Sequence, residues 1–446
     1  MKKHGPVFIL MFGLILLLPA FGQRSSVWPW PWPWTQMEEY AFPFLPVGGW
    51  NSPAAFSPIS LAMGETYLSS RNSTAGILNP AYLSSLTDPQ FSLSYRFTEN
   101  SYKTSSWPYY EIPAQGGYSE TYSFSRRTDY LDTAGLALPF EKWVLAANYF
   151  LFQEYNIPEI KGPFWDYPVP LAEPDIWIAY PQSVAQSGFM KGLNLAFSYR
   201  LTESFVLGAS VSYVFGDIER SQELPEVYYV QPDGNGGGTS PSNGLIPFTT
   251  QKYRYDAKGF FFNLGFTWEP SRQVMLGFSL RPPFSLDVQT DIELTDSAGQ
   301  GSYFSQEGYF KHPLVAVGSL LFHPLDSLRL TVDLSYWGWG EFSTDIDPGW
   351  FGGADFQSVV KLNLGAEYEI GLPFDVFEAL ALRAGYIYDP QPYSYSHNIA
   401  RDFVTFGFGL PVGDFDFHFA AKLGLSGKEQ NRFHSDVLQI GGGYRF

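Results

Sequence analysis

Basic side chains recur on one face of a series of alternating segments, and these are the residues that could bind a ligand chemically. In each segment every second residue is apolar, so the polar residues between them would point to the opposite side of a sheet. Guanidinium and ammonium groups bind anionic heads such as carboxylates, while aromatic rings in the same interior bind apolar tails. The candidate ligand-binding residues are Arg96, Phe150, Arg200, Phe261, Arg281, Trp337, Lys361, Arg383 and Lys422.

A second interpretation of these charges is structural. The same faces also carry Arg329 and the acidic residues Asp333, Glu367 and Asp416. Buried charges are retained in proteins mainly when they are paired, so these groups would pair with one another and with a segment inside the structure. The binding and the pairing interpretations are compatible, because one or two cations can bind a ligand while the others are paired.

Catalytic chemistry has little support in the sequence. The chain has six His residues, and of these only His312 and His418 fall on predicted strands. It contains neither a Gly-x-Ser-x-Gly elbow nor a His-x-x-x-His pair, the spacings that hydrolases and zinc enzymes use. We therefore predict a protein that is not an enzyme, with no catalytic residues, no metal ligands and no cofactor.

The elements that position the polar faces are strands. Alternation with a period of two predicts fourteen of them. The last strand ends the chain, with Leu438, Ile440, Tyr444 and Phe446 on one face and small or polar residues on the other, including Gly441 and Gly443. The aromatic terminus formed by Tyr444 and Phe446 matches the signal that barrel-assembly machinery reads. The predicted strands cover 91–97, 131–138, 143–152, 193–199, 207–215, 260–268, 274–280, 313–322, 328–337, 360–368, 380–388, 403–410, 415–423 and 437–446.

The connections between the strands alternate in length. They are long after the odd-numbered strands and mostly short after the even-numbered ones, as in outer-membrane barrels with tight periplasmic turns and long outer loops. Such long loops do not fit a soluble sandwich. The predicted fold is therefore all-β, a transmembrane antiparallel β-barrel of about 14 strands whose outer face contacts outer-membrane lipid. We expect a monomer.

Composition and the amino-terminal residues agree with this class. Residues 1–22 have Lys2 and Lys3 followed by an apolar run and small residues, which is typical of a signal peptide cleaved near Gly22 and Gln23. The chain has no Cys, so no disulfide framework supports its fold, and a formal charge of −17 excludes nucleic acid as an expected partner. These features predict export to the bacterial outer membrane.

Two further segments precede the first strand. In residues 23–56, the run Trp28 to Trp34 alternates Trp with Pro and should be extended, because Pro cannot join a helix or a central strand. Its indoles would anchor the segment at a membrane interface or against the barrel wall, or alternatively occupy a ligand path. Residues 57–88 are predicted to form a hatch inside the lumen, and residues 89–446 the barrel.

Two groups of residues resemble the FadL family of outer-membrane transporters. A small-residue segment ends in Asn79-Pro80-Ala81 just before the first strand, where that family has its hatch motif. The segments from Leu382 to Pro392, with its Arg-Ala-Gly core, and Arg281-Pro282-Pro283-Phe284 are also similar to FadL-type strands, and the prolines should break the ladder locally.

The resemblance implies a function and a route. It implies uptake of hydrophobic, fatty-acid-like molecules through a plugged barrel, without energy coupling of its own, and lateral release through a break in the third strand. The third predicted strand, Trp143 to Phe152, contains neither Gly nor Pro, so the sequence shows no sign of such a break.

Other channel classes remain as alternatives. A general porin usually lacks an amino-terminal plug, and a non-transporting FadL relative would serve protein secretion or surface interaction through its long loops. A TonB-dependent receptor, with about 22 strands, is excluded by the length of the chain.

Overall fold

The computed structural model describes residues 56–105, 121–169, 176–223, 228–230, 239–241, 248–296, 299–346, 356–374, 379–390, 392, 400–425 and 432–446. The predicted leader and nearly all of the Trp/Pro-rich segment, including Trp28 to Trp34, lie outside these residues.

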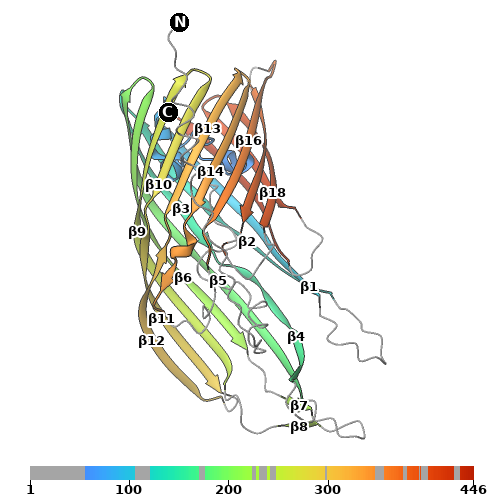
Figure 1. Cartoon of the computed structure of the whole chain (residues 1–446). Helices are drawn as coiled ribbons and strands as arrows, with labels where there is room; N and C mark the ends of the chain where they lie inside the picture. Colours follow the sequence, from blue (N-terminus) through green and yellow to red (C-terminus); the bar gives the residue numbers. More distant parts are fainter. Residues whose placement is uncertain are drawn as a thin grey trace, which may run out of the picture. The chain divides into compact units, whose positions relative to one another are not determined.

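Fourteen antiparallel strands form a closed ring (Figure 1). Each strand pairs with the next, and the last pairs with the first, so ladder bonds run around the whole ring. Each coincides with one of the segments predicted from alternation, which confirms the predicted barrel. In ring order the strands are β1 (Gln90–Ser105), β2 (Thr121–Pro139), β3 (Trp143–Glu154), β5 (Ile176–Thr202), β6 (Phe205–Glu223), β9 (Phe248–Ser271), β10 (Val274–Arg281), β13 (Val315–Leu325), β14 (Leu328–Trp337), β16 (Val359–Gly371), β17 (Ala379–Pro390), β18 (Ala400–Val412), β19 (Phe415–Gly424) and β20 (Arg432–Arg445).

Further strands extend the wall at the end opposite the carboxyl terminus (Figure 1). The second half of β9 pairs with β10, whereas its first half pairs with β11 (Phe284–Asp296), which forms a hairpin with β12 (Gly301–His312). Pro282 and Pro283 separate β10 from β11, as the lack of a proline N–H predicts. The remaining strands are β4 (Ile157–Val169), β7 (Tyr228–Val230), β8 (Thr239–Pro241) and β15 (Ser343–Thr344).

The outer face of the wall is apolar over a limited height. On β9 the outward-facing side chains Phe260 and Phe262 are exposed. Closer to the end of the barrel that the further strands extend, which we call the outer extension, the same face carries the exposed residues Asp256 and Lys258. An apolar band bounded by charged residues is the pattern of a barrel wall in lipid. The membrane boundary on this strand therefore falls between Lys258 and Phe260.

The closing strand β20 has the predicted orientation. Leu438, Ile440, Tyr444 and Phe446 are exposed on the outer face, whereas Gln439 between them is fully buried. β20 pairs with β1 along its length, and the Phe446 backbone N–H donates to the Pro89 carbonyl at 3.0 Å.

The segment from Phe56 to Leu86 packs inside the ring and contains three helices. These are α3 (Pro58–Ala62), α4 (Ala75–Leu78) and the 3-10 helix η1 (Pro80–Ser85), and most of their side chains are buried. A short 3-10 helix, η2 (Trp339–Glu341), follows β14. Among the described residues, no helix has the length and apolar character needed to cross a membrane. We call residues 57–88 the hatch.

The Asn79-Pro80-Ala81 motif is held against the wall at η1. The Asn79 side chain accepts from the Ala81 N–H at 3.2 Å and donates to the Phe266 and Phe278 carbonyls at 3.4 and 3.3 Å. Pro follows this capping Asn at the first helical position, where its missing N–H costs nothing. The motif thus caps its own helix and ties it to β9 and β10.

Hydrogen bonds join the hatch to strands around the ring. Side chains of the wall donate to hatch carbonyls, and the Tyr67 N–H of the hatch donates to the Asp333 carboxylate at 2.6 Å. A closed wall that bonds the segment from several sides holds it more firmly than one contact would. The donors to hatch carbonyls include Asn148 to Ser73, Asn263 to Ile77, Ser279 to Leu78, Asn363 to Gly64 and Thr405 to Ala62, at 3.1, 2.6, 2.7, 2.6 and 3.0 Å.

Candidate functional site

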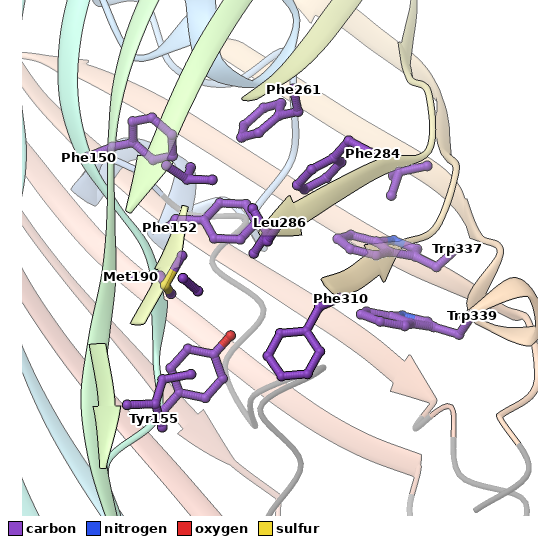
Figure 2. Close-up of a cluster of buried hydrophobic side chains, with 14 of the residues drawn as sticks. Phe150, Phe152, Tyr155, Met190, Phe261, Phe284, Leu286, Phe310, Trp337 and Trp339 are labelled. Atoms are coloured by element: carbon purple, nitrogen blue, oxygen red, sulfur yellow. The ribbon is translucent and has the colours of Figure 1, made fainter. Parts of the chain in front are cut away.

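A cluster of aromatic side chains fills the lumen on the outer side of the hatch (Figure 2). Phe150 and Phe152 come from β3, Phe261 from β9 and Phe284 from β11, and their rings contact edge to face or tilted. The Phe152 and Phe261 centroids are 5.6 Å apart, and those of Phe261 and Phe284 are 5.1 Å apart. Trp337 of β14 and Trp339 complete the far wall with parallel rings. We call this cluster the aromatic chamber.

One cation lies inside the aromatic chamber. The guanidinium carbon of Arg281, at the end of β10, is 5.5 Å from the Phe261 ring centroid, 5.8 Å from that of Phe284 and 5.3 Å from that of Trp337. These distances are typical of cation–π contacts. None of the ion pairs formed within the described part of the chain includes Arg281. Aromatic faces therefore compensate for a charge that has no carboxylate beside it.

The polar neighbours of Arg281 are Tyr67 and His312. Burial raises the pKa of the Tyr67 phenol to about 12, although the Arg281 charge opposes the shift, so this hydroxyl is neutral. The His312 ring lies parallel to the Phe284 ring with centroids 4.6 Å apart. Neither neighbour supplies a negative charge. The chamber thus presents a positive group to an apolar space.

The free space in the chamber is small. A cavity of about 50 Å³ lies among Tyr67, Phe152, Arg281, His312 and Trp337. An apolar cavity that holds benzene measures about 150 Å³. A ligand therefore has to displace side chains of the chamber.

The structure brings four of the nine predicted ligand-binding residues into one place. Phe150, Phe261, Arg281 and Trp337 all lie in the chamber. Lys361 lies at its edge, with its ammonium 4.6 Å from the Trp337 centroid and paired with Asp389 at 2.5 Å.

The other four predicted residues lie elsewhere. Arg96 pairs with Asp132 at 3.0 Å, Lys422 pairs with Glu65 of the hatch at 2.9 Å, and Arg383 pairs with Glu367 at 2.6 Å. Arg200 is exposed near the turn after β5 and donates to the Ser84 carbonyl at 3.0 Å. For these cations the structure supports the pairing interpretation.

Other predicted charges follow the same pairing. Arg329 shares Glu367 with Arg383 and lies 3.0 Å from its other oxygen, while Asp416 is 3.4 Å from Arg445. Within the described residues, no group of three or more His, Cys, Asp or Glu side chains could hold a metal ion.

Several chamber residues are not among the ligand-binding residues predicted from the sequence. Phe284 stands in the Arg-Pro-Pro-Phe motif, and Trp339 follows Trp337 at a spacing of two, so both carried a signal. Phe152 also carried a signal, because it lies two residues after Phe150 and alternation places both rings on the same face. Phe310 and Tyr155 lie outside the fourteen predicted strands, so the predicted ring gives no position for them.

The wall has a gap between β2 and β3. β1 pairs with β2 along nearly its whole length, from Thr121 to Ala137, but β3 pairs with β2 only between Pro139 and Thr133. Within the described residues, β4 continues along β5 and forms no ladder with β2. The sequence shows no sign of a break within the third strand, and β3 runs as one strand from Trp143 to Glu154; the gap lies between it and β2.

The cause of the gap is the end of β3 rather than a glycine or proline within it. From Phe150 to Glu154 every side chain is buried, whereas earlier residues alternate, and the pairing with β5 is irregular between Leu151 and Gln153. Gly192 of β5 leaves room for the inward ring, since a Cβ there would lie 2.3 Å from the Phe150 ring. β3 therefore stays paired with β5 as far as Glu154 while its last residues line the chamber.

Comparisons with known proteins agree with this architecture. A family model described as outer membrane protein transport protein (OMPP1/FadL/TodX) matches residues 182–403. Among functionally curated proteins, none matches the chain.

Solved structures with the same fold include a FadL homologue and two toluene transporters. A FadL homologue of Pseudomonas aeruginosa has a TM-score of 0.58 and 15% identity, covering 87% of this chain and 98% of its own. The toluene transporter TodX of Pseudomonas putida gives 0.54 and 16%, with 87% and 97% covered. The toluene transporter TbuX of Ralstonia pickettii gives 0.55 and 14%, with 89% and 99% covered.

Proposed function

Because the chain belongs to the OMPP1/FadL/TodX family of outer-membrane transport proteins for hydrophobic compounds, we propose that its substrates carry an anionic head on an apolar body. Fatty-acid-like carboxylates are the class that fits best. The molecule enters from the side of the outer extension, binds in the aromatic chamber and moves down its own concentration gradient, without energy coupling by this chain. Cleavage of the leader near Gly22 and Gln23 would precede assembly in the outer membrane.

The observation that carries this proposal is Arg281. A buried charge is costly unless it is paired, and the other chamber-facing groups are aromatic or neutral. A carboxylate can accept two parallel N–H bonds from a guanidinium, which is stronger than a bond between neutral groups. The rings of Phe152, Phe261 and Trp337 would then bury the apolar body of the same molecule.

The route out of the chamber follows from the hatch and the gap. The hatch occupies the lumen on the periplasmic side and is bonded to several strands. The gap between β2 and β3 opens beside Phe152 in the chamber wall. We infer that the ligand leaves sideways through this gap rather than past the hatch.

The test compares a charged with a neutral ligand. We expect Arg281→Gln to weaken binding of laurate to the purified protein at least about tenfold, since hydrogen bonds to charged groups contribute about 1.5–3 kcal/mol. Binding of toluene, which has no charge, should change little. Titration calorimetry in a non-ionic detergent measures both ligands.

Arg200→Gln is the matched control. Arg200 is an exposed predicted cation outside the chamber, so its loss should leave laurate binding unchanged. Equal weakening of laurate and toluene by Arg281→Gln, or no weakening of either, would contradict an anionic head and favour a neutral hydrophobic substrate.

A further inference from the structure

Side chains, rather than a backbone ladder, close the gap in the barrel wall. The residues that face each other across it are Thr128 and Tyr130 of β2 on one side and the end of β3 with Asn156 on the other. By contrast, long main-chain ladders join β1 to β20, β5 to β6 and β6 to β9. The bonds across this gap therefore decide whether it is open or shut.

Glu154 is the centre of these bonds. Its side chain belongs to the last residue of β3 and is buried. One carboxylate oxygen accepts from the Thr128 hydroxyl and from the Asn156 amide, the latter at 3.1 Å, and the other accepts from the Tyr130 hydroxyl at 2.8 Å. Two of these three bonds cross the gap.

Three further contacts near Glu154 join β1 and β2 to the β3 and β5 side of the gap. The Asn100 side chain of β1 donates to the Asn156 carbonyl at 2.8 Å, and Arg126 of β2 donates to the Gln186 carbonyl of β5 at 3.0 Å. The Tyr130 ring packs edge to face on Phe189 of β5, with centroids 5.2 Å apart. The closure is therefore a small set of side-chain contacts.

The energy of such a closure is modest. The net contribution of a single hydrogen bond is small, so a few side-chain bonds resist opening far less than a ladder of several rungs. The chamber residue Phe152 precedes Glu154 by two residues, and the chamber residue Tyr155 follows it directly. Release of Glu154 from β2 would free the segment that lines the chamber.

We propose that Glu154 is a latch: its bonds to Thr128 and Tyr130 keep the β2–β3 gap shut, and breaking them opens the aromatic chamber at the edge of the apolar band, where exposed Leu131 gives way to exposed Asp129 on the outer face of β2. The proposal rests on the proposed function only in assigning the gap as the ligand's exit. The latch positions the wall and does not itself bind the ligand.

The experiment measures access from the lipid, independently of any ligand. The chain has no Cys, so Phe152→Cys introduces one thiol in the chamber. In nanodiscs that contain a phospholipid with a maleimide on one acyl chain, this thiol reacts only when the gap is open. Adding Thr128→Val and Tyr130→Phe removes both bonds across the gap and keeps the side-chain sizes. We expect labelling at position 152 to become about tenfold faster or more.

Two controls define the result. Tyr95→Phe removes a similar bond, from the Tyr95 hydroxyl to Asp129 at 2.5 Å, between β1 and β2 and away from the gap, and should leave the labelling rate unchanged. Leu131→Cys places a thiol on the lipid-exposed face and should be labelled rapidly in every background.

The outcomes are separable. Folding of each variant is verified by heat-modifiable migration in gels, and Tyr130→Phe alone replaces the double change if that variant does not fold. Unchanged labelling at position 152 while position 131 reacts would overturn the latch. Faster labelling together with unaltered laurate binding by Arg281→Gln would keep the latch and reject the anionic substrate.

Discussion

Small residues on the inner wall decide where the hatch can lie. A Cβ on Gly208 of β6 would lie 2.2 Å from the Ala81 backbone nitrogen, and one on Gly265 of β9 would lie 2.1 Å from the Asn79 side-chain oxygen. Both glycines face the Asn79-Pro80-Ala81 motif. A side chain at either position would displace the motif or the strand, because such close contacts do not occur in folded proteins.

The close approach of Gly208 to the Asn79-Pro80-Ala81 motif leads to a testable prediction. Gly208→Ala should loosen the hatch and raise ion conductance through single channels in planar bilayers, since overpacking costs about 1–3 kcal/mol. Gly318→Ala is the matched control, because a Cβ on Gly318 of β13 meets nothing within 4 Å. Equal conductance of the two variants would show that Gly208 does not seat the hatch.

The basic residues on the inward faces differ in whether an acidic partner lies beside them. Arg96, Arg383 and Lys422 each have an acidic partner, and the partner of Lys422 is Glu65 in the hatch. Arg281 differs because its surroundings are aromatic. Residue type does not distinguish these positions, since all four are basic groups on inward faces.

Among the strands, the closing strand β20 and the third strand of the ring, β3, behave differently. β20 keeps strict alternation and pairs fully with β1, so its aromatic end is displayed on the outer face. The Tyr444 ring contacts Phe415 of β19 and Phe446, with centroids 4.7 and 6.0 Å apart. Tyr444 and Phe446 therefore form an exposed aromatic pair at the terminus, which we propose as the signal for barrel-assembly machinery.

This proposal predicts an assembly defect. Phe446→Ala should reduce the amount of heat-modifiable protein in the outer membrane several-fold, because the change removes the terminal ring but no ladder bond. Phe417→Ala is the control, since Phe417 is a similarly exposed aromatic residue on β19. The variant refolded in detergent should match the unaltered protein in thermal unfolding. Normal membrane levels of the Phe446 variant would refute a signal at this residue.

β3 shows the opposite behaviour within one element. Its first half alternates and pairs on both sides, whereas the residues after Tyr149 are all buried. The change follows from packing with Gly192 and the chamber rings, which are distant in sequence. One strand can therefore serve as wall at one end and as chamber lining at the other.

At the scale of the whole molecule, a closed wall and an inner segment divide two tasks. The wall satisfies backbone groups in lipid, and the hatch fills the lumen through bonds to strands on different sides of the ring. Because the strands pair with one another independently of the hatch, removing it should leave the ring intact.

This division predicts the effect of deletions. A chain without residues 24–86 should still form a heat-modifiable barrel and should conduct ions steadily in planar bilayers, whereas the full chain should remain closed. A chain without residues 24–55 alone should also remain closed, because the hatch is kept. Unchanged conductance in the longer deletion would contradict the hatch assignment, and conductance in the shorter one would assign closure to the Trp28 to Trp34 segment.

The sequence by itself determined the strands and their faces. Alternation is a local property, since each side chain in a strand points opposite to the one before it, and an apolar face must meet lipid. The fourteen strands, the outward face of Leu438 and Phe446, and the position of the Asn79 motif before β1 all follow from that rule.

Only the tertiary structure decided which inward residues act together. Pairing of Arg96 with Asp132 or of Lys422 with Glu65 depends on which strands and hatch residues lie opposite each other. The room for the Phe150 ring of β3 comes from Gly192 on another strand, and Arg281 meets Phe261 and Trp337 only when the ring closes. These contacts join residues far apart in the chain, and a periodicity read along one segment contains no information about its partners.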